Sequence, residues 1–343
     1  MSPPPPPCST GRPPSWATTC SSCAWKVRNK GQWGGRRGEG EERREERGAG
    51  GLSPKTFSSS PTFPFTPLSS FAPSPLSPLP LFPPFVGPKD KLDSTVISQP
   101  AIYVASLAAV EKVRAELGQA ALDAVDVAAG LSLGEYTALT FAGALTFEDG
   151  LRLVKLRGES MQAAADAAPS GMVSVIGLDA DKVAALCEAA SAQAPPGQGV
   201  RIANFLCPGN YAVSGGLAGC EAVEALGKEH GARMTVRLAV AGSFHTDFMA
   251  PAGDALRAAL AATAVSAPRI PVISNVDASP HADPATIKDL LARQLTSPVQ
   301  WEASMRALLE RGLASATEVG PNKVTAGIMK RIDKKFPMDN VTV

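Results

Sequence analysis

Apolar and polar positions divide the chain into a first segment without period and a longer part with a regular pattern. Residues 1–88 show neither a helical nor a strand period, because prolines, glycines and charged residues interrupt every apolar run. From residue 101 onward, apolar positions recur every three or four residues, which predicts amphipathic helices, and short apolar runs between them predict strands. The folded part of the chain is therefore expected within residues 91–343.

Helices and strands alternate over residues 101–168 and again over residues 247–331. The predicted helices are 101–117, 135–142, 146–168, 247–262, 284–294, 301–311 and 323–331, and the predicted strands are 126–129, 271–274 and 316–319. Such alternation is typical of an α/β fold with a parallel sheet. We therefore predict an α/β core built from residues 91–168 and 239–343.

A different order of elements interrupts this core. The predicted strands are 171–178, 200–205, 211–214 and 233–238, and the predicted helices between them are 181–190 and 219–230. Their order, βαββαβ, is that of the split βαβ unit found in ferredoxin-like folds. Residues 169–238 are therefore expected to form an inserted ferredoxin-like α+β subdomain.

Composition identifies the first segment as a separate region. Of the 31 prolines, 18 precede Lys89, among runs of serine, glycine and arginine. Such a segment buries too little apolar area to offset the entropy of ordering it, so we expect residues 1–90 to be disordered. Its first 38 residues carry no acid, which favours targeting to a plastid or mitochondrion, whereas the Glu–Arg block and the Pro–Leu–Phe tract that follow do not. A mistaken gene model is the alternative explanation.

Charge, hydropathy and cysteine spacing argue against several classes of function. The net charge of +1 gives no reason to expect nucleic-acid binding, and the basic residues between positions 26 and 47 are interleaved with glutamates. No run of about 20 apolar residues predicts a membrane span. Cys20 and Cys23 have the spacing of a metal-binding pair, but no second pair completes a zinc site.

Gly130-Leu-Ser132-Leu-Gly134 is a G-x-S-x-G motif between a predicted strand and a predicted helix. In that context the glycines allow a sharp turn that exposes the serine hydroxyl, and the N–H groups at the start of the helix face a developing oxyanion. The motif alone is common by chance. With its context it predicts that Ser132 is a nucleophile in a hydrolase-like core.

A serine nucleophile needs a base, and the chain contains three histidines. His230 ends a predicted helix, where a cation has an ordinary structural role, and His281 lies in a predicted turn. His245 follows a predicted strand and precedes a helix, and the carboxyl ends of strands line the ligand crevice of α/β proteins. We therefore expect His245 to be the base, with a plain residue at a helix N-terminus as the alternative.

Five motifs in this order carry a family resemblance. They are Gly-Leu-Ser-Leu-Gly-Glu-Tyr at 130–136, Leu-Val-Lys-Leu-Arg-Gly at 153–158, Asn-Phe-Leu-Cys-Pro-Gly at 204–209, Ser-Phe-His-Thr at 243–246 and Ser-Pro-Val-Gln-Trp at 297–301. Over residues 91–343 the chain resembles the malonyl-CoA:acyl carrier protein transacylases, most closely their plant and algal organelle type. Members load malonyl groups onto acyl carrier protein for fatty-acid synthesis, through a malonyl-serine intermediate.

The resemblance implies roles for particular residues. Ser132 would be the nucleophile and His245 the base, with the imidazole held by a backbone carbonyl, which we assign to Gln300. The N–H of Leu133 would contribute to the oxyanion hole. Arg157 matches the arginine that binds the malonyl carboxylate, since its planar donors can pair a carboxylate in two places.

Two further positions match the family near its site. Asn204 would be a supporting hydrogen-bond donor, and Phe244 matches the bulky residue that accompanies malonyl specificity, with core packing as its alternative role. The implied partners are malonyl-CoA and acyl carrier protein. The resemblance implies no metal or dissociable cofactor, and a monomer is expected.

One family element has no counterpart before residue 91. Family members begin with a strand and a Pro-Gly-Gln-Gly loop whose glutamine helps to complete the oxyanion hole, and Pro196-Gly-Gln-Gly199 instead lies in a loop of the predicted insert. Losing one oxyanion donor typically costs ~10²–10³ in rate. A catalytically weak or inactive remnant that binds carrier protein or coenzyme A is therefore one alternative function. A thioesterase or lipase-like hydrolase is the other.

Overall fold

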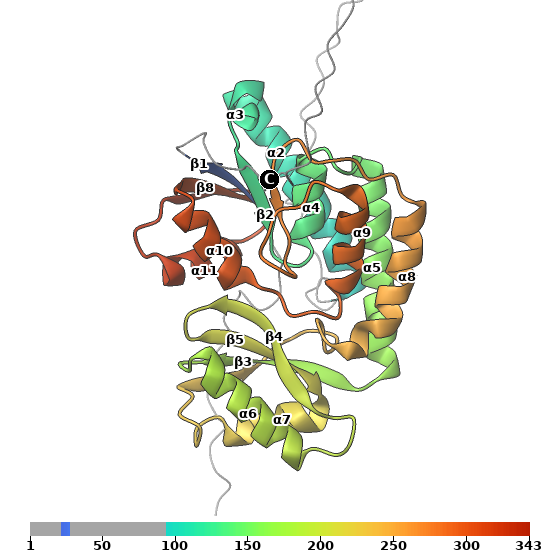
Figure 1. The fold of residues 1–343 in the computed structure, drawn as a ribbon, viewed down its shortest axis with the longest axis vertical. Coiled ribbons are helices and arrows are strands. Elements are labelled where there is room, and N and C mark those ends of the chain that lie inside the picture. Colours follow the sequence, from blue (N-terminus) through green and yellow to red (C-terminus); the bar gives the residue numbers. More distant parts are fainter. Residues whose placement is uncertain (1–21, 28–93) are drawn as a thin grey trace, which may run out of the picture. The chain divides into compact units, whose positions relative to one another are not determined.

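A mixed sheet forms the centre of the larger part of the fold (Figure 1). The computed structural model describes residues 22–27 and 94–343. The strands of this sheet are β1 (Ser22–Val27), β2 (Val127–Gly130), β7 (Val272–Ile273), β8 (Leu313–Val319) and β9 (Met338–Val341), in the order β7-β2-β1-β8-β9. β7 is parallel to β2 and β9 is parallel to β8, whereas β1 is antiparallel to both β2 and β8. Four strands therefore share one direction, as predicted for the core, and β1 runs against them.

The central strand β1 corrects one expectation from composition. Residues 1–90 were expected to be disordered, and for Ser22–Val27 this is wrong, because they pair with both neighbouring strands, Ala24 lying opposite Ala128 and Thr317. Without β1, the facing edges of β2 and β8 would present backbone donors and acceptors with no strand between them. Six residues among prolines and glycines are too short a run for periodicity to reveal. The rest of the segment, residues 1–21 and 28–93, lies outside the described residues.

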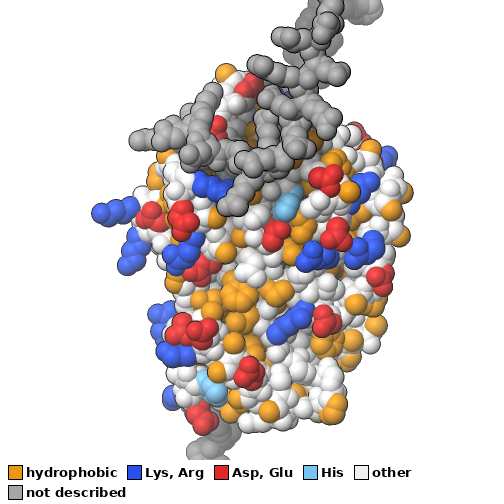
Figure 2. Space-filling model, viewed as in Figure 1, with side chains coloured by type: hydrophobic (Ala, Val, Ile, Leu, Met, Phe, Trp, Pro, Cys, Tyr) orange, Lys and Arg blue, Asp and Glu red, His pale blue; other side chains and the backbone are white. Residues whose placement is uncertain are grey.

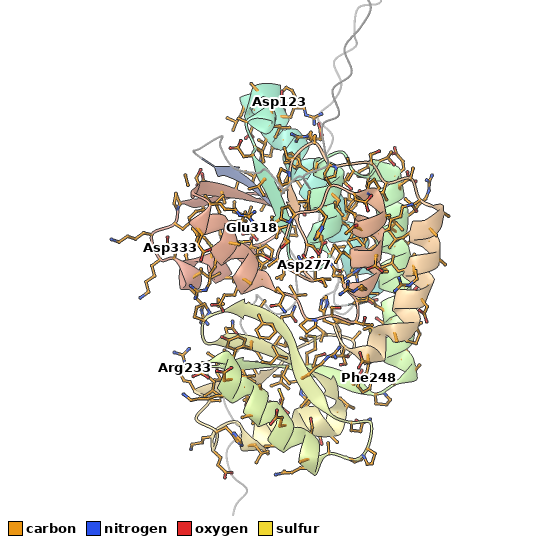
Figure 3. The ribbon with its side chains drawn as sticks, viewed as in Figure 1. Asp123, Arg233, Phe248, Asp277, Glu318 and Asp333 are labelled. Carbon is orange, nitrogen blue, oxygen red and sulfur yellow. The ribbon has the colours of Figure 1, made fainter. Side chains whose placement is uncertain are left out.

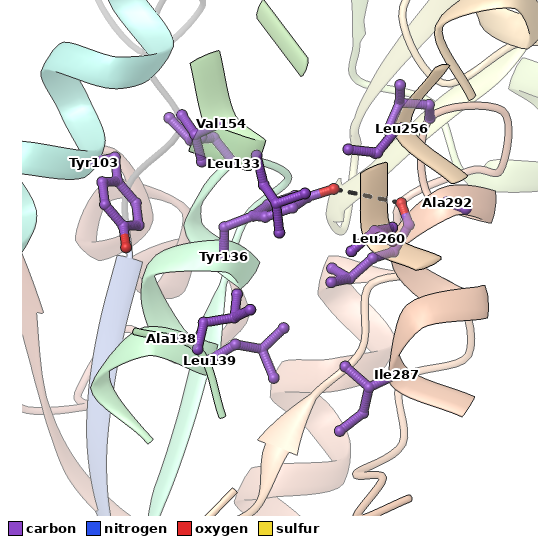
Figure 4. Packing of buried hydrophobic residues seen from close by; sticks show 14 of the residues in the cluster. Tyr103, Leu133, Tyr136, Ala138, Leu139, Val154, Leu256, Leu260, Ile287 and Ala292 are labelled. Carbon is purple, nitrogen blue, oxygen red and sulfur yellow. Dashed lines mark hydrogen bonds between the residues drawn. The ribbon is translucent and has the colours of Figure 1, made fainter. Parts of the chain in front are cut away.

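Helices pack beside this sheet in two groups. They are α2 (Thr95–Leu117), α3 (Gln119–Asp123), α4 (Gly134–Phe141), α5 (Phe147–Ala167), η2 (Asp247–Met249), α8 (Ala250–Ala262), α9 (Pro284–Arg293), α10 (Trp301–Glu310) and α11 (Val324–Ile332). Helices α5, α8 and α9 lie together on one side, and α10 and α11 lie near β8 (Figure 1). Residues of α4, α5 and α8, among them Leu139, Val154 and Leu256, share one buried cluster (Figure 4). This packing fixes α4, which begins at the predicted serine turn.

The starts of α5 and α2 determine which of their residues lie near the serine turn. The side chain of Thr146 accepts a hydrogen bond from the N–H of Asp149 at 3.1 Å, which confirms the predicted cap of α5. Helix α2 begins at Thr95, six residues before its predicted start, with Pro100 inside it. Proline lacks the backbone donor and its ring crowds the carbonyl four residues earlier, here that of Val96, so the disturbance falls in the second turn of this long helix. The longer helix brings Thr95 and Gln99 to the cavity described below. The hydroxyl of Thr95 donates to the carbonyl of Gly158 in α5 at 3.0 Å.

The insert has the predicted βαββαβ order. Its elements are β3 (Ser170–Ile176), α6 (Ala180–Gln193), β4 (Val200–Cys207), β5 (Asn210–Gly216), α7 (Leu217–Leu226) and β6 (Met234–Arg237). The sheet order β4-β5-β3-β6, with antiparallel neighbours, is that of a ferredoxin-like unit. A separate buried cluster that includes Val173, Leu186 and Val223 holds its helices on the sheet. The domain boundaries at 168/169 and 238/239 stay a prediction.

Backbone bonds attach the insert to the core. The N–H of Val299 donates to the carbonyl of Ala203 at 2.8 Å, and the N–H of Phe205 donates to the carbonyl of Val299 at 2.9 Å. Strand β4 therefore pairs briefly with the segment that precedes α10. In the part of the chain that the structure describes, no helix is long and apolar enough to cross a bilayer.

Candidate active site

Ser132 lies in a strained turn between β2 and α4. Its φ is 52°, in the left-handed region that residues other than glycine rarely occupy. A Cβ on Gly130 would lie 1.9 Å from the carbonyl carbon of Gly134, so the turn can close only because this position is glycine. The predicted strand–turn–helix context of the motif is confirmed. It places the serine hydroxyl at the carboxyl end of β2.

His245 lies within hydrogen-bond distance of Ser132. The Oγ–Nε2 distance is 2.9 Å, and both side chains are buried. The other ring nitrogen, Nδ1, lies 2.8 Å from the carbonyl oxygen of Gln294. Because a carbonyl can only accept, Nδ1 carries the proton and the lone pair of Nε2 faces the serine hydroxyl. The predicted pairing of this serine with this histidine is therefore seen in the structure.

The carbonyl that holds the imidazole belongs to Gln294, so the expectation for Gln300 is wrong. The N–H of Gln300 donates to the carbonyl of Asn275, and its own carbonyl accepts from Ser304 at the start of α10. Gln294 follows the last residue of α9, where helix carbonyls have no intrahelical partner and are free to accept. The correct carbonyl thus comes from a helix end, six residues earlier in the chain.

Burial and a neighbouring cation keep the imidazole neutral. Loss of water, together with the positive charge of Arg157, lowers the pKa of His245 to about 4, and the bond to the Gln294 carbonyl partly opposes this shift. A neutral imidazole can take a proton at neutral pH. The pair is therefore set for general base catalysis at Ser132.

Arg157 brings a buried positive charge to the same hydroxyl. Only 1% of the residue is exposed, and its guanidinium lies 5.6 Å from the ring centre of Tyr136. It donates to Ser132 Oγ at 2.9 Å, to Gln99 Oε1 at 2.5 Å and to Gln294 Oε1 at 3.1 Å. Its Nε has no hydrogen-bond partner among the described residues. A planar donor group with an unused buried N–H is suited to receive an anion.

These three groups line one cavity of about 130 Å³. Asn204 and Phe244, both predicted to lie near the site, also line it, but no hydrogen bond of the Asn204 side chain is found among the described residues. Leu133 lines it too, and this residue, directly after Ser132, is the N-cap of α4. Most of the remaining wall is apolar, including residues of α2, α5 and the segment from 238 to 241. The cavity therefore offers a small polar end at the serine and an apolar approach.

Sequence reasoning missed four polar residues of the site: Gln99, which accepts from Arg157, and Glu135, Asn275 and Gln294, which bond to the serine turn or to one another. Gln99 lay before the predicted start of its helix, and Glu135 belongs to the family motif at 130–136 but was assigned no role. Asn275 follows β7, where the rule that site residues follow strand ends could have found it. Gln294 carried no signal, because an amide at a helix end is ordinary.

Space-filling and stick views show the surroundings. In Figure 2, hydrophobic side chains gather over the middle of the visible face, with charged side chains around them. In Figure 3, Asp277 lies in the segment after β7, and Glu318 lies on β8. Among the described residues no group of three or more His, Cys, Asp or Glu could hold a metal ion.

Comparisons with known proteins agree on one family. Residues 59–343 match the family model described as the acyl transferase domain. The malonyl CoA-acyl carrier protein transacylase of Bacillus subtilis is 38% identical over 252 residues, which cover 74% of this chain and 77% of that protein. The mitochondrial malonyl-CoA-acyl carrier protein transacylase of Homo sapiens is 40% identical, covering 71% of this chain and 64% of that protein.

Solved structures agree in fold as well as in sequence. The malonyl-CoA:acyl carrier protein transacylase of Xanthomonas oryzae superimposes with a TM-score of 0.70 at 40% identity, over 75% of this chain and 80% of that one. A malonyl-transacylase in complex with its type II PKS acyl-carrier protein gives 0.70 at 33% identity, over 75% and 81%. Together with the Ser132–His245 pair on its turn, these matches place the chain in the acyl transferase family, among the malonyl-CoA–acyl carrier protein transacylases.

Proposed function

We propose that this protein transfers a malonyl group from malonyl-CoA to the phosphopantetheine thiol of acyl carrier protein, for fatty-acid synthesis. The observation that carries the proposal is the convergence of His245 Nε2 and a buried Arg157 donor on the hydroxyl of Ser132, each at 2.9 Å. The first supplies a base and the second a site for a carboxylate. The relatives named above are transacylases of this kind.

In the first half-reaction Ser132 Oγ attacks the thioester carbonyl carbon while its proton passes to His245 Nε2. The N–H of Leu133 faces the oxyanion of the tetrahedral intermediate. When the carbon–sulfur bond breaks, the proton on Nε2 passes to the departing thiolate of coenzyme A. A malonyl ester of Ser132 remains.

In the second half-reaction the carrier thiol attacks the ester carbonyl carbon and gives its proton to His245 Nε2. The carbon–oxygen bond to Ser132 breaks, and the same proton returns to Oγ. Bonds and protons balance over the cycle, and the resting enzyme is restored. The carbonyl of Gln294 keeps the imidazole in the tautomer that both steps need.

Arg157 selects the acyl group. A malonyl carboxylate would pair with the guanidinium, whose Nε is unused and whose surroundings exclude water. An acetyl group would leave this charge without an anion in the cavity. Fixing the free carboxylate also orients the ester carbonyl at Ser132, which favours transfer to a carrier over hydrolysis.

Intact mass spectrometry tests the first half-reaction. The purified chain is exposed briefly to malonyl-CoA or acetyl-CoA, together with Ser132→Ala and Arg157→Ala. We expect a malonyl adduct on the wild type that is absent from Ser132→Ala and at least ~10-fold slower to form on Arg157→Ala, since a buried ion pair is lost. Acetyl-CoA should give little adduct.

Matched controls separate the site from general damage. Ser304→Ala removes a buried serine of α10, and Arg152→Ala removes an exposed arginine of α5; both should form the adduct at the wild-type rate. Adding carrier protein should then discharge the adduct onto its thiol. A folded wild type that takes no malonyl group would favour the inactive remnant, and rapid release of free malonate without carrier would favour the hydrolase.

We further propose that the protein is of the plant and algal organelle type and acts as a monomer in a plastid or mitochondrion. Support comes from the acid-free first residues and from the mitochondrial relatives of Homo sapiens and Mus musculus, at 40% and 39% identity. Imaging residues 1–93 fused to a fluorescent protein, and sedimentation of the purified chain, test the two statements. A diffuse cytoplasmic signal or a dimer would contradict them.

A further inference from the structure

Glu135 is a buried carboxylate three residues after Ser132, in the first turn of α4. It is 3% exposed. One of its oxygens, Oε2, accepts two hydrogen bonds: from the backbone N–H of Asn275 at 3.0 Å and from Nε2 of Gln294 at 2.8 Å. The mechanism above assigns this carboxylate no role. Burial of a carboxylate costs free energy even when the carboxylate accepts hydrogen bonds, so its place beside the serine turn calls for an explanation.

Asn275, whose backbone N–H Glu135 accepts, bonds through its side chain to both sides of the serine turn. Asn275 Oδ1 accepts from the N–H of Ser132 at 2.6 Å, and Asn275 Nδ2 donates to the carbonyl of Gly130 at 2.8 Å. These bonds span the residue whose φ is 52°. They keep the turn in a conformation that the backbone would otherwise rarely adopt.

Gln294, the second residue that donates to Glu135, connects Ser132 with Arg157 and His245. Gln294 Nε2 also donates to the carbonyl of Ser132 at 2.9 Å, and its Oε1 accepts from Arg157. The main-chain carbonyl of the same residue accepts from His245. One glutamine thus contacts the nucleophile, the base and the guanidinium at once.

We infer that Glu135 is a positioning residue, which fixes Asn275 and Gln294 and through them sets the geometry of Ser132, His245 and Arg157. The inference deepens the proposed function and rests on it for the roles of those three residues. It does not require that the acyl group is malonyl.

Near neutral pH, Glu135 is present in both its ionised and its protonated form. Burial raises its pKa to about 7, helped by the neighbouring Asp277, while the two N–H donors and the charge of Arg157 oppose the shift. Tyr136, the next residue of α4, keeps its proton because burial raises its pKa. Since both donors meet one oxygen, a proton on the other oxygen leaves the two bonds in place. An amide can therefore replace the carboxyl, whereas an apolar side chain cannot.

Sulfonylation by phenylmethanesulfonyl fluoride tests this without malonyl-CoA. In that reaction Ser132 Oγ bonds to sulfur, fluoride leaves, and His245 takes the hydroxyl proton, so the rate reports the activation of the serine alone. The variants are Glu135→Met, which keeps volume but offers only a weak thioether acceptor, and Glu135→Gln, which keeps an oxygen acceptor. Glu318→Met is the matched control, because Glu318 is also fully buried and accepts from two backbone N–H groups, of Thr325 and Ala326, at the start of α11 (Figure 3).

We expect Glu135→Met to label ~10–100-fold more slowly than the wild type, because small misplacements of reacting groups cost rate on this scale. Glu135→Gln and Glu318→Met should stay within about 3-fold of the wild type. Malonyl-CoA kinetics should show the loss in kcat, with KM changed less than about 3-fold. A purely structural role would not produce rescue by glutamine together with this division between kcat and KM.

Wild-type labelling of Glu135→Met, or an equal loss in Glu318→Met, overturns the inference. If Glu135→Met does not fold, Gln294→Met breaks the same link from its other end, and a wild-type labelling rate there overturns it as well. A wild type that reacts with the sulfonyl fluoride but not with malonyl-CoA would refute the proposed function and leave the test of Glu135 intact. A folded wild type whose Ser132 reacts with neither would overturn both.

Discussion

The carbonyl oxygen of Gln294 lies 2.8 Å from Nδ1 of His245, and the side chain of the same glutamine donates to the carbonyl of Ser132 at 2.9 Å. The end of α9 thus holds the base with its main chain and the nucleophile with its side chain. Because Gln294 has no exposed surface, water cannot replace these bonds. The orientation of the base therefore depends on where this helix ends.

Replacing Gln294 should separate its two roles. Gln294→Ala keeps the main-chain carbonyl and loses the contacts to Ser132, Glu135 and Arg157, so we expect kcat/KM for malonyl transfer to fall by roughly 10–100-fold. Gln300→Ala should stay within about 2-fold, because neither its side chain nor its carbonyl contacts the imidazole. Steady-state kinetics of both variants measure this. An equal loss in the two would contradict the role given to the Gln294 side chain.

The low pKa of His245 has a consequence for activity. Because the folded pKa is about 4 and the ordinary value is 6.5, the imidazole stays neutral at pH 5.5. Acylation by malonyl-CoA should therefore keep its base well below pH 6.5 and lose it only as the pH approaches 4. Single-turnover rates between pH 4 and 8 measure this. A base limb at pH 6.5 would show that the imidazole is not desolvated.

The same shift makes a contribution to stability that depends on pH. Between pH 6.5 and 4 the unfolded chain binds a proton at His245 that the folded chain does not, so this contribution to the free energy of unfolding falls as the pH drops, by roughly 3 kcal/mol in full. His245→Gln should therefore gain stability relative to the wild type between pH 7.5 and 4.5. Urea unfolding at both pH values measures the difference. Glu135 titrates in both proteins, so its opposite effect largely cancels in the comparison.

Gly130 should tolerate no side chain. Gly130→Ala would bring its Cβ within 1.9 Å of the backbone of Gly134, so we expect loss of the serine turn, with no adduct from malonyl-CoA and a lower melting temperature. Gly327→Ala is the control, because a Cβ there meets nothing within 4 Å and alanine favours the helix α11. Circular dichroism and the adduct assay measure the pair. A folded, active Gly130→Ala would mean that the turn can relax.

The central place of β1 predicts that its backbone is needed for folding. Ala24→Pro removes a donor from a strand that pairs on both sides, which should destabilise the protein by about 3 kcal/mol or more. Ala24→Ser keeps the donor, so it should destabilise the protein less than Ala24→Pro does. Thermal unfolding of the two variants decides between them. Equal melting temperatures would show that another segment can occupy the gap between β2 and β8.

Much of the fold could be predicted because its elements are long or follow familiar rules. The periodicity of α5 and its Thr146 cap gave the correct start, and the βαββαβ order of the insert follows from short apolar runs between helices. Strands β1 and β9 and helix α3 were missed, since a few residues carry too little pattern. Helix α2 was predicted to begin at residue 101, directly after Pro100, whereas the structure continues the helix through this proline to Thr95.

The sequence by itself determined the chemistry of the pair, since a serine between two glycines after a strand, and one histidine after another strand, already predicted Ser132 and His245. It also determined the family, through five ordered motifs. Only the tertiary structure decided what holds that pair. Glu135, Asn275 and Gln294 are ordinary polar residues in the sequence, and they reach the serine turn because α4, the end of β7 and the end of α9 pack against one another. Local periodicity records which face of an element is buried, but not which buried amide another element will meet.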